Sequence, residues 1–425
     1  MTIDSLLKGI DPLISSTLDR ALSDREISEK QAVELFESTG AEMNVVVLVA
    51  NELRRRTVGN NVTYVINRNI NFTNVCIKRC GFCAFSKDFR QEEGYFLPIG
   101  EIIRRAKEAS DLGATEICIQ AGLPPKMDGH LYIDICNAVK KKLPNIHIHA
   151  FSPEEVLYGA IKSELPVKEY LKMLKEAGVG SLPGTAAEIL DQEVRNTISP
   201  GRISSKDWIN IIKLAHSMQI PTSSTIMYGH VESSVHKAKH LALIRSIQKE
   251  THGFTEFVPL SFVHSEAPMY NHNLIPNIRP GADGNEVIKM HAISRIMLHG
   301  YINNIQVSWV KEGPRMSQLL LAAGANDFGG TLINESISTA AGAQYGQLMK
   351  PKEIRSIIRS AGRIPAQRST TYLLLKIYHV EEDYNNTSDT RLDKVDPQEF
   401  GSYHELIKLD AFRYKDRDQN KNSNK

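Results

Sequence analysis

The sequence has little of three things: cysteine, net charge and long apolar runs. Only five of its 425 residues are cysteine, and an odd number with three crowded together does not suit the disulfide framework of a secreted protein. The formal net charge is only +2, so no positive excess points to nucleic acid or to an acidic membrane surface. No apolar run is long enough to span a bilayer. We therefore expect a cytoplasmic protein with no nucleic-acid partner and no membrane partner.

The sequence does have a regular alternation of strand-like and helix-like segments. Residues 1–63 predict helices, whereas eight short apolar or alternating segments follow between 64 and 345, with helical stretches between them. These candidate strands are 70–75, 115–122, 146–152, 179–184, 221–229, 254–262, 302–310 and 326–333. The alternation predicts an α/β fold, a (β/α)8 TIM-type barrel with an N-terminal helical extension. We expect a short C-terminal extension packed on the barrel at 346–415 and a disordered tail at 416–425.

Three of the five cysteines lie in one loop that follows the first candidate strand. Cys76, Cys80 and Cys83 have the spacing C-x-x-x-C-x-x-C. A structural zinc site normally has four ligands, and no partner pair of cysteines or histidines occurs elsewhere. An iron–sulfur cluster held by three thiolates would instead keep one iron open for another ligand. Because barrel active sites form at the ends of the strands, three ligands with one vacancy there indicate a reactive centre.

The cysteine loop resembles the signature of the radical S-adenosylmethionine (SAM) superfamily. The resemblance rests on the pattern C-x-x-x-C-x-aromatic-C, in which Phe82 is the aromatic residue. It implies a 4Fe-4S cluster on Cys76, Cys80 and Cys83 whose open iron binds SAM. It also implies that an electron from the cluster cleaves SAM to methionine and a 5′-deoxyadenosyl radical.

Longer phrases between residues 65 and 368 resemble one branch of that superfamily, the CofH family. Among them are "CGFCAFS", "IHIHAFSPEEV", "SLPGTAAEILDQEVR", "GFTEFVPLSFVHSEAPMY" and "GANDFGGTLINESIS". The resemblance implies that the enzyme cleaves the Cα–Cβ bond of L-tyrosine and joins the 4-hydroxybenzyl radical to 5-amino-6-(D-ribitylamino)uracil, releasing 2-iminoacetate. This reaction belongs to the biosynthesis of the deazaflavin chromophore of coenzyme F(420).

The same resemblance implies a CofG-type partner subunit, which closes the deazaflavin ring, and an electron donor. The chain holds a single cysteine triad, which suits a separate CofH subunit rather than a fusion. Menaquinone-pathway enzymes that make aminofutalosine or cyclise dehypoxanthine futalosine share many of these phrases. The activity of one of these menaquinone-pathway enzymes is therefore the alternative function.

Five residues are expected to contact SAM on the strength of the resemblance. Glu188 and Arg195 match residues that contact the methionine part in related barrels, and Arg suits a carboxylate because its guanidinium is a bidentate donor. Gln120 and Gly122 end the second strand, where related enzymes have a motif that approaches the amino group of SAM. The sequence "IQAG" differs from the usual Gly-Gly-Glu motif. Phe82 is expected near the adenine. The alternatives are a surface ion pair for the first two residues and packing against the barrel wall for Phe82.

Five further residues near strand ends are candidates for catalysis or substrate binding. His149 shares the inner face of its strand because side chains alternate, and a core histidine is the alternative. Tyr228, His230 and His264 follow later strands and suit a phenol, a uracil and a ribityl chain. The alternative for each of the three is an ordinary loop residue with no role in the reaction. Glu256 would be unfavourable to bury unpaired, so we expect it to face a polar group or water.

A few other residues are given structural or secondary roles. Cys118 and Cys136 stand alone and are expected to be small buried hydrophobes. Gln306 and Ser308 are expected to face the barrel interior, and Arg368 near the end of the chain is expected to be structural.

Overall fold

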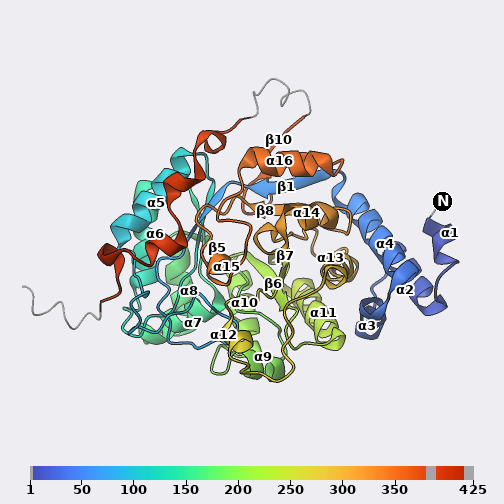
Figure 1. Ribbon diagram of the computed structural model, residues 1–425, viewed down its shortest axis with the longest axis horizontal. Coiled ribbons are helices and arrows are strands. Elements are labelled where there is room, and N and C mark those ends of the chain that lie inside the picture. The colour runs from blue at the N-terminus through green and yellow to red at the C-terminus, as the bar shows by residue number, and fades with distance from the viewer. Residues whose placement is uncertain (1–2, 380–388, 416–425) are drawn as a thin grey trace, which may run out of the picture.

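Four helices form the N-terminal part of the molecule. The computed structural model describes residues 3–379 and 389–415, so the predicted tail at 416–425 lies outside the described residues. The Asp11 carboxylate caps α2, and Ser28 forms a capping box at the start of α3. Figure 1 shows these helices to the right of the strands. Their bounds are α1 (Ile3–Leu7), α2 (Pro12–Leu22), α3 (Glu29–Glu37) and α4 (Gly40–Val58).

Eight strand positions close into a ring, which confirms the predicted (β/α)8 barrel. The strands are β1 (Asn61–Val65), β2 (Asn67–Ile70), β3 (Glu116–Ile119), β4 (His147–His149), β5 (Val179–Ser181), β6 (Thr222–Tyr228), β7 (Phe254–Ser261) and β8 (Asp327–Gly330). Parallel ladders run from β2 through β3 and β4 to β5, from β6 to β7, and from β8 to β1. Single parallel bridges join β5 to β6, β7 to Ile305, and Gln306 to β8. Segments β1 and β2 share one of the eight positions, and Ile305 with Gln306 occupies the position between β7 and β8.

Two of the candidate strands differ from the structure. The first strand occupies residues 61–70 rather than 70–75, because the polar groups of 71–75 bond to other loops instead of to a ladder. For example, the Tyr95 N–H donates to Asn74 Oδ1 at 2.9 Å. The segment 302–310 contributes only two bridged residues. There the Ile305 N–H donates to the side chain of Asn326 at 2.9 Å, which replaces a ladder bond.

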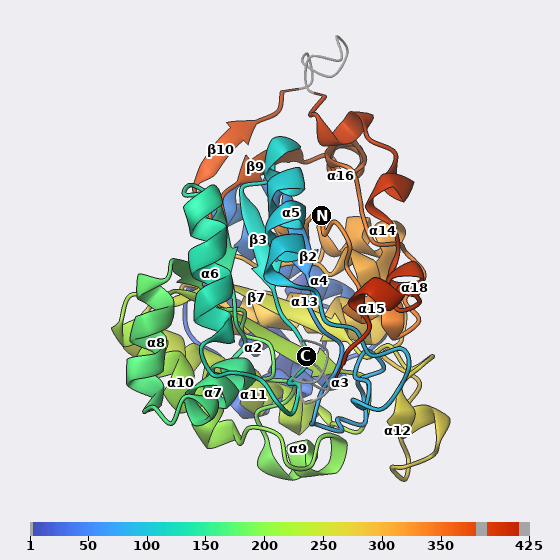
Figure 2. The same ribbon diagram turned by 90° about the vertical axis from the view of Figure 1, so that its left-hand side faces the viewer.

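The helices that follow the strands cover the outside of the ring. Helical stretches were expected between the strands, and three of them are the amphipathic helices α5, α8 and α10. Figure 2 shows α5 and α6 side by side next to β3. The short α12 instead packs on the cysteine loop, and α15 contributes to the cavity wall. The helices between residues 99 and 340 are α5 (Ile99–Asp111), α6 (Leu131–Lys142), α7 (Pro153–Lys162), α8 (Val167–Glu176), α9 (Gln192–Ile198), α10 (Ser205–Ser217), α11 (Ser234–Thr251), α12 (Pro268–Asn271), α13 (Gly284–Leu298), α14 (Trp309–Leu320) and α15 (Ile337–Ala340).

The C-terminal part returns to the barrel in two places. It contains α16 (Pro351–Ser360), β9 (Ile364–Arg368), β10 (Leu374–Ile377), η1 (Leu392–Lys394), η2 (Pro397–Phe400), α18 (Tyr403–Leu406) and η3 (Asp410–Phe412). Strand β9 pairs in parallel with β1 and antiparallel with β10. Farther on, Phe96 donates to the carbonyl of Phe412 at 2.7 Å, beside the cysteine loop. In Figure 1 this last segment runs down the left side near α5 and α6.

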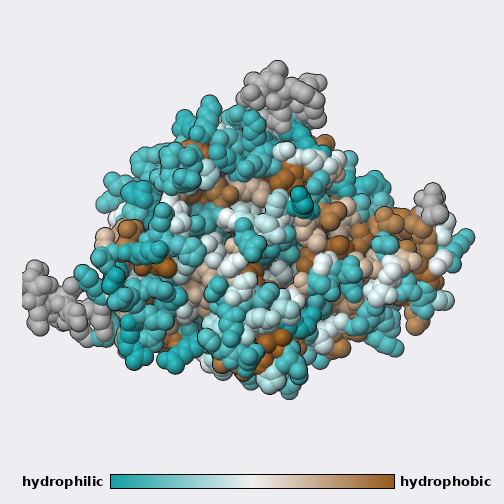
Figure 3. Space-filling model, in the orientation of Figure 1, coloured by the Kyte–Doolittle hydropathy of each residue, from teal (hydrophilic) through white to brown (hydrophobic). Residues whose placement is uncertain are grey.

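The surface differs between the two sides of the molecule. In Figure 3 hydrophobic atoms gather on the right, over the N-terminal helices, and the left side is mainly hydrophilic. Leu13 and Leu48 are among the exposed apolar residues of these helices. No helix of the described residues has the length and apolar character needed to cross a bilayer.

Candidate active site

A cavity of about 390 Å³ lies inside the barrel and opens beside the cysteine loop. Its wall is formed by that loop, by strand ends and by the end of β9. Most of the residues that the sequence proposed for the site line this cavity. They are Cys76, Cys80, Phe82, Cys83, Gln120, Gly122, His149, Glu188 and Glu256. Tyr228, His230, His264 and Arg195 do not line it.

The cysteine loop has no regular structure, and backbone hydrogen bonds hold it on both sides. The Gly81 N–H donates to the carbonyl of Ile198 at 2.9 Å, and the Met269 N–H donates to the carbonyl of Gly81 at 2.7 Å. A Cβ at Gly81 would lie 2.9 Å from the Met269 Cβ, so the close approach of α12 requires glycine there. The loop is therefore fixed against α9 and α12 by its backbone, which leaves the three thiols directed to the cavity.

The three thiols suit a cluster better than a single ion. Burial raises the pKa of the Cys80 thiol to about 12, and the neighbouring Arg202 acts in the opposite direction. Such thiols become thiolates only beside a strong positive partner such as iron. Within residues 3–379 and 389–415, no three His, Cys, Asp or Glu side chains are placed around one point as ligands of a single metal ion. A cluster takes one thiolate per iron, so its three ligands are spread apart.

Arg202, which the sequence reasoning missed, is the central cation at this end of the cavity. Its Nη1 lies 2.7 Å from Glu188 Oε1, and its Nε lies 3.5 Å from Glu154 Oε2. The guanidinium lies over the ring of Phe82, 5.3 Å from the centroid. Glu154 also pairs with Lys78 at 3.3 Å. We call these residues, together with the three cysteines, the cluster end of the cavity.

Arg195 lies behind the cluster end rather than on its surface. The side chain is fully buried and donates to the carbonyls of Ala187 and Ile203. Ala187 precedes Glu188, and Ile203 follows Arg202. Arg195 therefore joins the two segments that carry the ion pair, and Arg202 occupies the position at the cavity that the sequence assigned to Arg195.

Gln120 and Gly122 belong to a tightly built turn after β3. A Cβ at Gly122 would meet the carbonyl oxygen of Val75 at 2.3 Å, so only glycine allows the cysteine loop to approach so closely. The Ala121 N–H donates at 2.8 Å to Glu155, a buried cavity-lining carboxylate that also caps α7. Burial raises the pKa of Glu155 to about 7. Sequence reasoning missed this residue, although "SPEE" is a capping-box pattern.

The opposite end of the cavity is closed by a buried ion pair near the N-terminal ends of β7 and β8. Arg368, at the end of β9, contacts both oxygens of Asp327 at 2.5 and 2.9 Å and lies over the ring of Tyr372. Glu256 faces the cavity beside this pair, and burial raises its pKa to about 7. We call Asp327, Arg368, Glu256 and His149 the floor.

His149 contacts the cavity with its ring held in place. Its Nδ1 lies 2.7 Å from Ser181 Oγ, which also contacts His147 Nε2 at 2.7 Å. Burial lowers the pKa of His149 to about 4, so the ring is neutral at pH 7. Unlike His149, His147 does not line the cavity.

Tyr228, His230 and His264 lie around the cavity instead of inside it. The Tyr228 side chain is fully buried, on the face of β6 opposite Met227, which lines the cavity. His264 is half-buried and packs edge-on against the ring of Tyr270.

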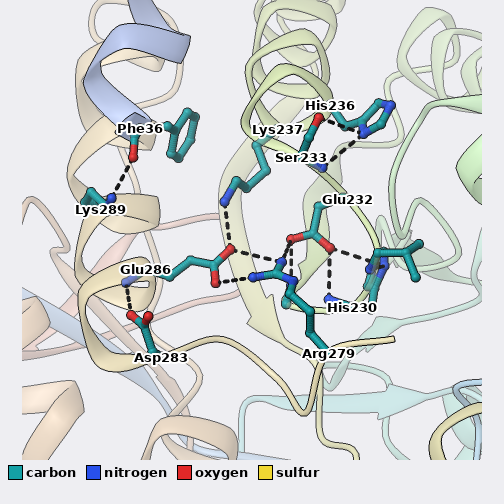
Figure 4. A network of polar contacts seen from close by, with 12 residues as sticks. Phe36, His230, Glu232, Ser233, His236, Lys237, Arg279, Asp283, Glu286 and Lys289 are labelled. Carbon is teal, nitrogen blue, oxygen red and sulfur yellow. Dashed lines mark hydrogen bonds and ion pairs between the residues drawn. The ribbon is translucent and has the colours of Figure 1, made fainter. Parts of the chain in front are cut away.

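His230 belongs to a network of polar contacts at the rim, which Figure 4 shows. The Glu232 carboxylate accepts from the backbone N–H groups of Gly229 and His230 at 2.8 and 2.9 Å. It also pairs with Arg279 at 2.6 Å, and Arg279 pairs with Glu286 at 2.7 Å. The network joins the loop after β6 to α13, so these side chains bond to each other rather than face the cavity.

The comparisons with known proteins agree with this geometry. Residues 70–244 match the family model of the radical SAM superfamily, and residues 251–380 match the model of the CofH/MqnC C-terminal region. A 5-amino-6-(D-ribitylamino)uracil–L-tyrosine 4-hydroxyphenyl transferase of Methanocaldococcus jannaschii is 51% identical over 356 residues, which cover 83% of this chain and 98% of the relative. The enzyme of the same name from Methanothermobacter thermautotrophicus is 47% identical, over 82% of this chain and 94% of the relative.

Solved structures show the same fold at low identity. The FeFe-hydrogenase maturase HydG from Carboxydothermus hydrogenoformans superposes with a TM-score of 0.65 at 15% identity, covering 87% of this chain and 83% of that one. Methylornithine synthase PylB gives 0.61 at 17% identity, covering 81% and 95%. The chain thus belongs to the radical SAM superfamily and, within it, to the family of 5-amino-6-(D-ribitylamino)uracil–L-tyrosine 4-hydroxyphenyl transferases.

Proposed function

We propose that this protein cleaves the Cα–Cβ bond of L-tyrosine and transfers the 4-hydroxybenzyl radical to 5-amino-6-(D-ribitylamino)uracil. The products would be the substituted uracil, 2-iminoacetate, methionine and 5′-deoxyadenosine, on the route to the deazaflavin of coenzyme F(420). The observation that carries the proposal is 51% identity over 98% of a relative with this activity in its name. The family model of the C-terminal half is shared with menaquinone enzymes, but the names of the similar relatives favour the tyrosine reaction.

The proposal assigns the cofactors to the cluster end. Cys76, Cys80 and Cys83 would hold a 4Fe-4S cluster, and SAM would bind against its open iron beside Phe82 and Glu188. When bound there, the cluster supplies the electron that cleaves SAM to the radical that takes a hydrogen atom from tyrosine. The position of all three thiols on one cavity wall supports this assignment. Gly122 supports it further, because its missing Cβ lets the cysteine loop pack closely against the end of β3.

The residues of the chain would position the reactants and exclude water. Arg202 holds Glu188 in one orientation at the cluster end, and the Asp327–Arg368 pair closes the far end. Hydroxyl and amide side chains between them suit a uracil and a ribityl chain, which offer many donors and acceptors. These include Asn67, Asn69, Ser223, Thr225, Gln306, Ser308 and Thr370. His149 and Glu256, both cavity-lining, are the candidates for moving a proton.

Partners and compartment complete the proposal. We assign the ring closure to a separate CofG-type subunit, because the chain has one cysteine triad. An external electron donor would reduce the cluster. All five cysteines are free, which supports a cytoplasmic, reducing environment.

One anaerobic assay tests the function. Cluster-loaded protein is incubated with SAM, dithionite, L-tyrosine and 5-amino-6-(D-ribitylamino)uracil, and the products are identified by mass spectrometry. We expect 5′-deoxyadenosine and a 4-hydroxybenzyl–uracil adduct. Turnover of dehypoxanthine futalosine or of an enolpyruvyl benzoate derivative, without turnover of tyrosine, would establish the menaquinone alternative instead.

A further inference from the structure

Lys311 is a half-buried cation for which the described residues provide no partner. It follows the strand position around Ile305, near the N-terminal end of α14, and its side chain lines the cavity. No described residue forms an ion pair or a hydrogen bond with its ammonium group, although every other charged group discussed for the site has one. Burial lowers the pKa of Lys311. An uncompensated charge in such a place is unfavourable unless a ligand supplies the opposite charge.

The nearby carboxylates do not supply the opposite charge for Lys311. Glu335, Glu312 and Glu188 are near enough for their charges to raise the pKa of Lys311. The Glu335 carboxylate, however, accepts from backbone N–H groups at the start of α15, at 3.0 to 3.4 Å. Glu188 is paired with Arg202. Glu312 is near Ser261, and its Oε1 is buried with no hydrogen-bond partner among the described residues. None of the three carboxylates forms an ion pair with Lys311, which remains available.

We propose that Lys311 binds the α-carboxylate of the substrate L-tyrosine. This inference rests on the proposed function and names a positioning residue within it. Of the two proposed substrates, only tyrosine carries a carboxylate, whereas the uracil and its ribityl chain are neutral. Lys311 lines the same cavity as Glu188 and the three cysteines, so a carboxylate bound to it would lie in the chamber where the amino acid part of tyrosine has to meet the radical.

The test uses L-tyrosinamide, in which a neutral amide of the same size replaces the carboxylate. Binding of L-tyrosine and of L-tyrosinamide to anaerobic, cluster-loaded protein with SAM is measured by calorimetry. We expect the wild type to bind tyrosine about 10 to 100 times more tightly, the range for a hydrogen bond between charged groups. If the wild type shows no preference for tyrosine, the inference is wrong without any variant being needed.

Three variants then test whether the preference for tyrosine over tyrosinamide depends on Lys311. Lys311→Met keeps the apolar stem and removes the charge, so its preference for tyrosine over tyrosinamide falls to within about threefold, since the pair is lost. Lys311→Arg keeps the charge and retains most of the preference. Lys237→Met is the matched control, because the buried Lys237 pairs with Glu286 at 2.7 Å and does not line the cavity. It should keep the wild-type preference. A Lys311→Met protein that also keeps it would overturn the inference.

Two further readouts separate this role from others. The SAM-dependent change in the EPR spectrum of the cluster should persist in Lys311→Met; its loss would assign Lys311 to SAM and overturn the inference. The melting temperature of the cluster-free protein should stay equal or rise in Lys311→Met, because an unpaired buried charge is removed. A clear fall would indicate a structural role. Failure of the wild type to form the uracil adduct would instead count against the proposed function, whatever Lys311 does.

Discussion

The two ends of the cavity satisfy their charges in different ways. At the floor, Arg368 and Asp327 form a bidentate pair, and Asp327 also accepts from Thr63 Oγ1 at 2.5 Å and from the Gly329 N–H at 2.8 Å. At the cluster end, Arg202 is shared by two glutamates, at 2.7 and 3.5 Å, and three thiols lie beside it without a cation of their own. The floor is complete within the protein, whereas the cluster end needs a ligand to complete it.

The two ends of the cavity therefore have different roles, one in holding the fold together and one in binding ligands. A completed buried pair fixes two strands but offers nothing to a substrate, whereas incompletely neutralised groups bind a cofactor or substrate strongly because little has to be rearranged. Changes to the Asp327–Arg368 pair should therefore act mainly on folding, and changes at the cluster end should act mainly on cofactor binding and turnover.

The largest expected effect is the loss of one cluster ligand. Cys80→Ala should reduce both 5′-deoxyadenosine and adduct formation to the background of a protein-free assay, because a cluster held by two thiolates is not retained. Iron and sulfide per chain should fall in parallel. Cys136→Ala is the matched control, since Cys136 is fully buried in α6 and does not line the cavity. If Cys80→Ala keeps a full complement of iron, the assignment of the cluster ligands is wrong.

The second effect concerns the floor. Asp327→Asn should lower the free energy of unfolding by about 3–5 kcal/mol, because it leaves the Arg368 charge buried and unpaired. Urea denaturation of cluster-free protein measures this. Asp111→Asn, which removes the partner of Lys107 in an exposed pair, should change stability by less than about 1 kcal/mol. Similar values for the two variants would show that the Asp327–Arg368 pair does not stabilise the folded protein.

The same contrast explains how much the sequence predicts. The cysteine spacing and the strand–helix alternation are local patterns, so they indicated the loop, the barrel and the expected position of the cavity. Arg368 was expected to be structural, and it does close the floor. Its contact with the cavity depends on the pairing of β9 with β1, some three hundred residues apart, and no local pattern reports such a pairing.

A shift of one residue within a strand and a shift of seven residues along the chain explain two further differences. In β6 the cavity-lining residues Ser223, Thr225 and Met227 alternate along one face, so Tyr228 belongs to the other face although it ends the strand. Arg202 lies seven residues after Arg195, and both are near Glu188 in sequence. Which of them reaches the cavity is decided by the carbonyls that capture Arg195, and these become neighbours only in the fold.

Glu256 gives the floor a pH dependence. Burial raises its pKa from 4.5 to about 7, so the folded state binds the proton more tightly than the unfolded state. Its contribution to stability is complete below pH 4.5 and is lost as the pH rises to about 7. Between pH 5 and pH 8, the wild type should lose about 3 kcal/mol of stability relative to Glu256→Gln, at 1.36 kcal/mol for each pKa unit.

The measurement is a urea denaturation series at both pH values on cluster-free protein. Glu176→Gln, on the exposed end of α8, is the control and should leave the pH dependence of the wild type unchanged. A pH dependence that is the same in Glu256→Gln and in the wild type would show that Glu256 is not the group responsible.

The smallest effect compares Arg202 at the cluster end with Arg195 behind it. Arg202→Met leaves Glu188 and Glu154 without their shared cation and should weaken SAM binding by about 10-fold, as expected for one lost charged hydrogen bond. Arg195→Met should mainly lower the melting temperature, because Arg195 is bonded to backbone carbonyls and does not line the cavity. Titration of the cluster EPR signal with SAM measures the first effect and thermal unfolding the second. If Arg195→Met weakens SAM binding more than Arg202→Met does, the assignment made from the sequence is right and the one drawn from the geometry is wrong.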